Sequence, residues 1–252
     1  ANVPEDGRRF NSLRDYIERR KTRFEPLFKS ADAVVAFTNV LSSDPLYRFA
    51  REANIHLVYI DAAQPWSLSS PGVALIEQPV TDVDWGTIEE SHDPVTRESP
   101  YFWLSLTNAI RMSDIIGSDL AQVFPDSAET ILSNRDALKE ELLSLYREFQ
   151  NRLFEVTDVS VFALANEFVY LTNDMGLFVD GYFIKQDIDW TQQDLDNLTA
   201  HLQSRKISVV LHKWEPSEAI QNAVTAAGAS IVVLDTADPG ISVDRRLAPN
   251  GY

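Results

Sequence analysis

A long run with helical periodicity constrains the fold of this chain more than any other feature. Residues 126–154 read DSAETILSNRDALKEELLSLYREFQNRLF, and their apolar side chains recur at steps of three, four and seven. A helix of this length spans roughly 40 Å at ~1.5 Å per residue, which exceeds the width of one small domain. Because strand and helix patterns alternate on both sides of it, we expect a continuous helix that joins two lobes. Its apolar residues are Ile131, Leu138, Leu142, Leu145, Phe149 and Leu153.

Short apolar segments rich in β-branched residues alternate with amphipathic segments on either side of this helix. This alternation is typical of βαβ units with parallel strands. We therefore predict an α/β fold of two βα lobes with small, mainly parallel sheets joined by one long α-helix. The expected ranges are 1–124 for the N-terminal lobe, 125–155 for the linking helix and 156–252 for the C-terminal lobe. The expected strands are 31–38, 56–61, 73–76, 159–164, 178–184, 207–211 and 230–234, and the expected shorter helices are 12–29, 44–54, 106–124, 166–174, 191–204 and 216–227.

The charge balance restricts the class of partner. The chain of 252 residues carries 22 basic and 38 acidic side chains, a formal net charge of −16. A surface of this sign disfavours nucleic acids and anionic membranes, because both need a basic face. The chain has no cysteine, which excludes disulfides, thiolate metal sites and cysteine nucleophiles. No run approaches the ~20 apolar residues of a membrane span, and we expect a cytosolic chain or a mature form without its signal peptide.

Motifs of common enzyme classes do not occur. The sequence contains no GxGxxG or GxxxxGK[ST] phosphate loop and no GxSxG elbow. None of its four histidines, His56, His92, His201 and His212, has the spacing of a metal pair. His92 lies in the acidic run 89–93, where a solvated loop is favoured over a loose cation site. We therefore expect no enzyme, and a nucleotide-binding α/β enzyme is disfavoured.

Three polar residues lie at the carboxyl ends of expected strands. Asp235 follows the apolar run 231–234, His212 follows Leu211, and Asp61, the last residue of the expected strand 56–61, follows Ile60. Ligands of open α/β sheets bind at the carboxyl ends of the strands, which makes these positions candidates. Every parallel sheet also has ordinary polar residues at its strand exits, so both interpretations stay open.

Four segments in order resemble one family. Residues 99–109, SPYFWLSLTNA, resemble the Asp-Pro-His-x-Trp-Leu-x-x-x-Asn-Ala motif of the zinc and manganese solute-binding proteins of bacterial ABC transporters (TroA-like proteins). Residues 31–35, ADAVV, resemble its Ala-Asp-Leu-Val-Val strand. Residues 165–171, ANEFVYL, followed by a Gly-Leu pair, resemble His-Asp-Ala-Phe-x-Tyr-Leu, and residues 233–235 resemble its Val-Leu-Asp. The resemblance covers about residues 30–240.

The resemblance implies two lobes joined by a long helix, with a metal ion between them held by three histidines and a carboxylate. In this chain Tyr101 stands at the position of the motif histidine and Ala165 at the position of the next, and no histidine precedes His56. Asp235 alone matches a metal ligand of the family. One carboxylate with a phenol does not supply the four ligands of a tight zinc site. We therefore expect no high-affinity zinc or manganese at the family's usual place and assign no cofactor.

Two hypotheses follow from the resemblance. The first is an extracytoplasmic solute-binding protein, monomeric, that presents its ligand to an ABC permease and has a degenerate or altered metal site. It would bind a weakly held cation, a metal complex or a small ligand in the cleft between the lobes. The second is a structural or partner-docking protein that binds no ligand on the same scaffold. The candidate cleft residues are Tyr101, Ala165, Asn166, Asp235, Trp214 and Trp66.

Overall fold

The structure is a computed structural model that describes residues 17–37, 46–85 and 98–236 and the backbone of two short strands near the C-terminus. Contacts divide the chain into two compact units. The first comprises residues 1–74, 107–144 and 237–252, and the second comprises 75–106 and 145–236. Both contain short parallel strands and helices, so the predicted α/β class with small parallel sheets is confirmed. The exact lobe boundaries stay a prediction, and the contacts group residues 75–106 with the second unit.

The first unit contains a two-stranded parallel sheet. Its strands β1 (Ala33–Ala36) and β2 (Val58–Asp61) pair in register from Ala33 opposite Val58 to Ala36 opposite Asp61, and helix α3 (Leu46–Ala53) connects them. Helix α2 (Lys21–Ser30) precedes β1, and the chain turns at residue 20. The expected helix 12–29 is therefore interrupted, and its first residues lie outside the described part.

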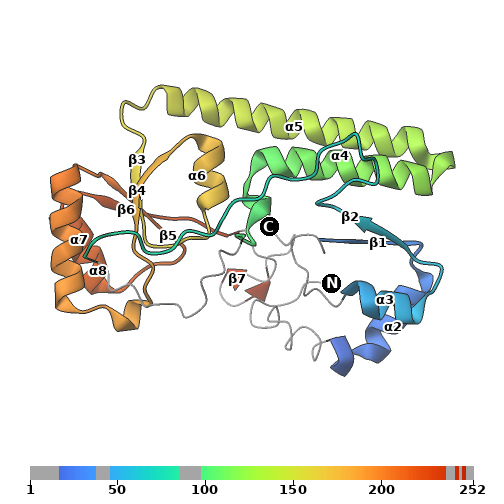
Figure 1. The fold of residues 1–252 in the computed structure, drawn as a ribbon, viewed down its shortest axis with the longest axis horizontal. Coiled ribbons are helices and arrows are strands. Elements are labelled where there is room, and N and C mark those ends of the chain that lie inside the picture. Colours follow the sequence, from blue (N-terminus) through green and yellow to red (C-terminus); the bar gives the residue numbers. More distant parts are fainter. Residues whose placement is uncertain (1–16, 38–45, 86–97, 237–241, 244–245, 248–252) are drawn as a thin grey trace. The chain divides into compact units, whose positions relative to one another are not determined.

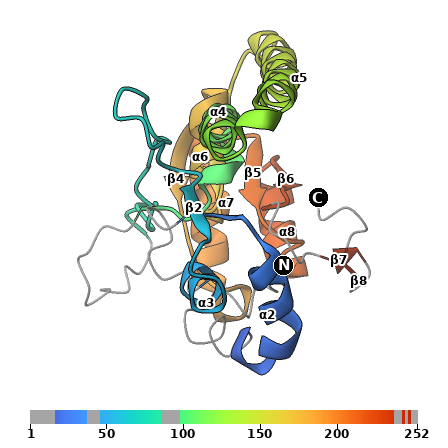
Figure 2. The same cartoon turned by 90° about the vertical axis from the view of Figure 1, so that its right-hand side faces the viewer.

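Helices α4 (Leu106–Val123) and α5 (Ala128–Phe154) are separated by a single 3-10 turn that begins at Pro125. The predicted long helix is thus continuous, and its first half lies beside α4 in the first unit (Figures 1 and 2). Polar contacts join the two: Lys139 Nζ lies 2.7 Å from Asp114 Oδ1, and Arg135 donates to Ser118 Oγ at 3.3 Å.

The apolar stripe of α5, which consists of Ile131, Leu138, Leu142, Leu145, Phe149 and Leu153, is covered only in part. Leu138, Leu145 and Phe149 are 46, 39 and 39% exposed, and none of the residues of α5, all of them described, is fully buried. The half-buried positions include Arg135 and Lys139, because ion pairs with α4 orient the helix. Ile131, Leu142 and Leu153 of the stripe are also half-buried, so the regular spacing predicted the helix correctly and its contact face in part.

The segment between the first strands and α4 was expected to contain a strand at residues 73–76, and this prediction is wrong. Within the described residues of this segment the only strand-type pairing is an isolated antiparallel bridge between Glu77 and Glu98. The buried side chain of Asn108 holds the segment instead, since it accepts from the backbone N–H of Ala74 at 2.8 Å and donates to its carbonyl at 3.0 Å.

The second unit contains a four-stranded parallel sheet in the order β4-β3-β5-β6. A register irregularity lies in β3 between Val161 and Phe162, where β3 pairs with β4. Helices α6, α7 and α8 alternate with the strands, as the sequence predicted, and α7 packs beside α8 (Figures 1 and 2). The bounds are β3 (Ser160–Ala163), α6 (Val169–Met175), β4 (Phe178–Tyr182), α7 (Gln192–Arg205), β5 (Val209–His212), α8 (Glu218–Ala226) and β6 (Ser230–Val233).

Local signals explain where these helices begin and end. Thr191 caps α7 in a capping box: its hydroxyl accepts from the Asp194 backbone N–H, and the Asp194 carboxylate accepts from the Thr191 N–H. Gly176 follows α6 with φ of 68°, a left-handed conformation that glycine adopts without strain. Two strands that we did not expect, β7 (Ser242–Val243) and β8 (Arg246–Leu247), form an antiparallel pair near the C-terminus.

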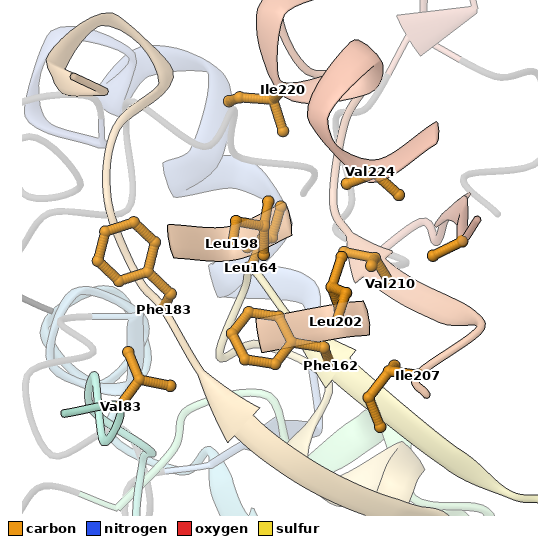
Figure 3. Close-up of a cluster of buried hydrophobic side chains, with 11 residues drawn as sticks. Val83, Phe162, Leu164, Phe183, Leu198, Leu202, Ile207, Val210, Ile220 and Val224 are labelled. Carbon is orange, nitrogen blue, oxygen red and sulfur yellow. The ribbon is translucent and has the colours of Figure 1, made fainter. Parts of the chain in front are cut away.

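The core of the second unit lies between its sheet and helices α7 and α8. Figure 3 shows Phe162 from β3, Leu198 and Leu202 from α7 and Val224 from α8 turned toward a common interior, and these side chains are at most 1% exposed. Val83 belongs to the same cluster, so the segment before α4 contributes to this core. The rigid positions of β3, β4 and β5 determine where the loops at their carboxyl ends project.

Candidate ligand pocket

An open pocket of about 510 Å³ lies within the second unit at the carboxyl ends of β4, β3 and β5. We call it the strand-end pocket. Its volume lies in the range of small-molecule sites, and its position is where parallel α/β sheets bind ligands. Its lining residues are Pro79, Val80, Thr81, Leu164, Ala165, Asn166, Glu167, Phe183, Ile184, Lys185, Gln186, Asp189, His212, Lys213 and Trp214.

An ion pair joins two of the three strand exits. The ammonium of Lys213, after β5, contacts the carboxylate of Glu167, in the loop after β3. The Glu167 side chain is 6% exposed and the Lys213 side chain 26%. A nearly buried carboxylate requires a partner of opposite charge, so Lys213 neutralises Glu167 at this site.

A second lysine lines the pocket after β4. Lys185 Nζ lies 2.9 Å from Asp194 Oδ2, and the same carboxylate closes the capping box with Thr191. Burial raises the pKa of Asp194, but hydrogen bonds from Lys185 and Thr191 outweigh burial and hold the pKa below its ordinary value. The carboxylate of Asp194 therefore stays charged at neutral pH.

His212, at the end of β5, is buried at 2% exposure. Its Nδ1 accepts from the Lys213 backbone N–H at 2.8 Å, so the neutral ring carries its proton on Nε2, which faces Asp187 Oδ1 at 3.5 Å. Burial lowers the pKa of His212 more than the neighbouring Asp187 raises it. With both nitrogens engaged and the ring neutral, His212 serves as a structural link rather than an open ligand.

Asp187 also orients the aromatic residue of the pocket. Its Oδ1 accepts from Trp214 Nε1 at 3.3 Å, and its Oδ2 accepts from the Ser217 backbone N–H at 3.0 Å. The Trp214 ring is 45% exposed, and Lys213 Nζ lies 4.5 Å from its centroid. This arrangement fixes an indole face at the pocket and a cation beside it.

The structure brings three of the six predicted cleft residues to this pocket: Ala165, Asn166 and Trp214. Ala165 is buried at 2% exposure and offers a methyl group where the family motif has histidine. Asn166 Nδ2 donates to the Pro79 carbonyl at 3.0 Å and so joins the β3 exit to residues 79–81, which form one wall.

Tyr101 and Asp235 lie in the second unit but do not line this pocket. The Tyr101 ring contacts Trp103 with a centroid distance of 5.4 Å, and Trp103 Nε1 donates to the carbonyl of Thr236 at 2.9 Å. Trp103 thus links the motif segment to the residue that follows Asp235. Asp235 itself is exposed.

Trp66 lies in the first unit, where its backbone N–H donates to Asp119 Oδ2 at 3.4 Å. Its side chain is 41% exposed. Asp119 is almost fully buried, and burial raises the pKa of this carboxyl group. The contacts of Trp66 are therefore those of a loop anchored to α4.

The side chains that the structure describes around the strand-end pocket do not form a zinc-type ligand set. Within residues 17–37, 46–85 and 98–236, no three or more histidine, aspartate or glutamate side chains are grouped so that they could hold a metal ion. Near Ala165 the available carboxylate, Glu167, is paired with Lys213, and His212 uses both ring nitrogens. His92, the remaining sequence candidate, lies outside the described residues.

Sequence reasoning missed the charged residues of the pocket. Lys213 directly follows His212 at the end of β5, and Lys185 lies three residues past β4, a strand whose exit was not examined. The available signal was their position one to three residues past a strand. Thr81 was missed because its segment carries no strand pattern. A bond to the segment that follows β4 places it: Thr81 Oγ1 accepts from the Ile184 backbone N–H at 2.9 Å.

Comparison with known proteins agrees with the motifs. A sequence model of the family described as zinc-uptake complex component A, periplasmic, matches residues 28–244. Zinc-binding lipoprotein AdcA from Streptococcus pneumoniae strain R6 is 28% identical over 155 residues, which are 60% of this chain and 30% of that protein. The same protein from the TIGR4 strain is 27% identical over the same share. The chain thus spans about a third of the length of these curated relatives.

Solved structures show the same fold. The zinc-bound ZnuA-like domain of Streptococcus pneumoniae AdcA superposes with a TM-score of 0.58 at 21% identity over 85% of this chain and 72% of that one. The metal-dependent lipoprotein YcdH from Bacillus subtilis gives a TM-score of 0.65 at 17% identity over 87% of this chain and 74% of that one. At these identities the likeness concerns the fold alone.

Proposed function

The chain belongs to the family of the periplasmic component A of zinc-uptake complexes, and on that premise we propose that it is an extracytoplasmic solute-binding protein of an ABC transporter with an altered metal site. It takes a solute that does not depend on a histidine set and presents it to a membrane permease. Both the permease partner and the location outside the cytoplasm are inferences from family membership. Among the described helices, none has the length and apolar character that a membrane span requires.

One observation supports the proposal that the metal site is altered. Two positions where the family motif has histidine hold Tyr101 and Ala165, and beside Ala165 the nearest carboxylate is neutralised by Lys213. A tight zinc site needs about four nitrogen, sulfur or oxygen ligands, and the chain has no cysteine to replace the missing imidazoles. The ligand is therefore a small organic molecule, a metal complex or a weakly held cation.

The strand-end pocket is the site that we assign to this solute. It combines an exposed indole, apolar walls and a few polar groups on rigid strand ends, which is the composition of small-molecule sites. Asn166 and Trp214 are the proposed contact residues. Asp235 remains the residue whose position matches a metal ligand of the family.

A solute panel followed by thermal unfolding tests this function. We expect at least one small organic solute or metal complex to raise the melting temperature of the wild-type protein, and Trp214→Ala to abolish the shift. Phe154→Ala is the matched control, since Phe154 is 93% exposed on α5 and lines no part of the pocket. If no solute shifts the wild-type protein, the proposal fails, and a structural or partner-docking role replaces it.

A further inference from the structure

We propose that the strand-end pocket binds a small organic polycarboxylate through the ammonium groups of Lys213 and Lys185, with its carbon skeleton against Trp214. This inference rests on the proposed function and names the class of solute. It concerns residues of the second unit only, and these residues are not metal ligands of the family motif.

The first support is that the basic side chains of the two ion pairs are more exposed than the acidic ones. In both ion pairs the acidic side chain is nearly buried and the lysine side chain is more exposed: Glu167 and Asp194 are 6 and 8% exposed, against 26 and 22% for Lys213 and Lys185. A molecule that enters the pocket therefore meets the ammonium groups before it meets the carboxylates. Asp189, the remaining acidic lining residue, is exposed and solvated.

The second support is hydrogen-bonding capacity. A lysine ammonium has three N–H donors. Among the described residues, the carboxylate partner of Lys213 is Glu167 and that of Lys185 is Asp194. Each ammonium therefore retains donors for a ligand carboxylate, and such charge-assisted bonds are stronger than neutral ones.

The third support is the spacing of the two cations. Lys185 follows β4 and Lys213 follows β5, and these strands flank β3 in the sheet. Two strand spacings of ~4.8 Å place the strand exits roughly 10 Å apart, a separation that two flexible lysine side chains and a ligand between them can span. A ligand with two or three carboxylates satisfies both cations, whereas a monocarboxylate satisfies one.

The apolar part of the pocket suits the remainder of such a ligand. Trp214 presents a half-exposed ring beside Lys213, and Val80, Ile184 and Phe183 supply further apolar surface. Polycarboxylates also bind divalent metal ions through their oxygens. The same lysines would therefore hold either the free anion or its metal complex, without a protein ligand to the metal.

Calorimetric titration with citrate and with zinc citrate tests the proposal. The variants are Lys185→Gln and the double variant Lys213→Gln with Glu167→Gln, which removes the ion pair without leaving a buried charge. Lys139→Gln is the matched control, because Lys139 forms a comparable ion pair with Asp114 in the first unit. Circular dichroism and melting temperature confirm that each variant folds.

We expect saturable binding by the wild-type protein and by Lys139→Gln, and a loss of about 10-fold or more in the pocket variants, since each loses a charge-assisted bond. Binding of citrate alone identifies the free anion as the ligand, and binding of zinc citrate alone identifies the complex. No binding of either by the wild-type protein, or equal binding by all variants, overturns the proposal. If another solute binds in a Trp214-dependent manner while citrate does not, this inference fails and the proposed function stands.

Discussion

The ammonium of Lys213 pairs with the nearly buried carboxylate of Glu167, two residues after Ala165. Ala165 is the position at which the family motif has a histidine. At this position the chain has a methyl group, and two residues later a carboxylate that an internal cation neutralises. A metal ion at this place would have to compete with Lys213 and would gain no nitrogen ligand from Ala165.

This pair predicts an asymmetric effect on stability. Lys213→Gln leaves Glu167 buried without its counter-charge, and we expect the free energy of unfolding to fall by about 2 kcal/mol. Adding Glu167→Gln should recover most of the loss, because an amide pair replaces the unpaired charge. Urea unfolding of the three proteins provides the measurement, and a double variant less stable than Lys213→Gln would contradict the account.

The buried amide of Asn108 should contribute strongly to folding stability. Asn108→Ala removes both hydrogen bonds to Ala74 and leaves two backbone groups without their partner, so we expect a loss of about 2–3 kcal/mol. Gln122→Ala is the control on the same helix, since its side chain makes an exposed bond of 3.4 Å. Equal melting temperatures for the two variants would show that Asn108 does not hold the segment.

Thr191 and Ser217, which precede helices α7 and α8, should differ in their contribution to folding stability. Thr191→Ala removes the capping box of α7 and should destabilise the protein by about 1 kcal/mol. Ser217 occupies the corresponding position of α8 but makes no side-chain capping bond, so Ser217→Ala should change stability by less than about 0.5 kcal/mol. Chemical denaturation of both variants checks the difference, and the reverse order would refute it.

His212 predicts a dependence of stability on pH. Burial lowers its pKa in the folded protein, whereas the pKa in the unfolded chain is about 6.5. Between these two values the unfolded state binds more protons, so the free energy of unfolding decreases as the pH falls below about 6.5. Above that pH His212 is neutral in both states, and the protein keeps its full free energy of unfolding with respect to this residue.

Urea unfolding at pH 7.5, 6.5 and 5.5 measures this dependence, with His212→Gln as the variant that cannot titrate. The wild-type protein should lose more stability than the variant over this range. A variant with the same pH profile as the wild type would exclude His212 as the cause. The contribution of the Lys185–Asp194 pair is lost only at lower pH, as the pH falls below about 4, since the pKa of Asp194 is lowered.

The sequence predicted most of the secondary structure because its periodicities are local. Helix α5 and the strands β3, β5 and β6 lie where their patterns placed them, within a few residues. The contact face of α5 was predictable only in part, because ion pairs of Arg135 and Lys139 with another helix also lie on it. Strand-like composition at residues 73–76 gave a wrong prediction, since the segment is held by the side chain of Asn108 rather than by a ladder.

The candidate site was predictable to the extent that strand exits can be counted along the chain. Ala165 and Asn166 were identified from a motif and Trp214 as an aromatic candidate, and the three line one pocket. That a ligand binds there stays a prediction. The ion pair between Lys213 and Glu167 joins residues 46 positions apart, and nothing in either local pattern predicts it. Whether Tyr101, Asp235 and Trp66 contact a ligand stays a prediction.

Zinc affinity tests the central claim most directly. The measurement is a titration of metal-stripped protein with zinc chloride in competition with a chromophoric chelator, for the wild type and Asp235→Ala. The account predicts that the chelator retains the zinc, with no site of sub-micromolar affinity and no difference between the two proteins. One zinc ion bound per chain with sub-micromolar affinity, and lost in Asp235→Ala, would contradict it.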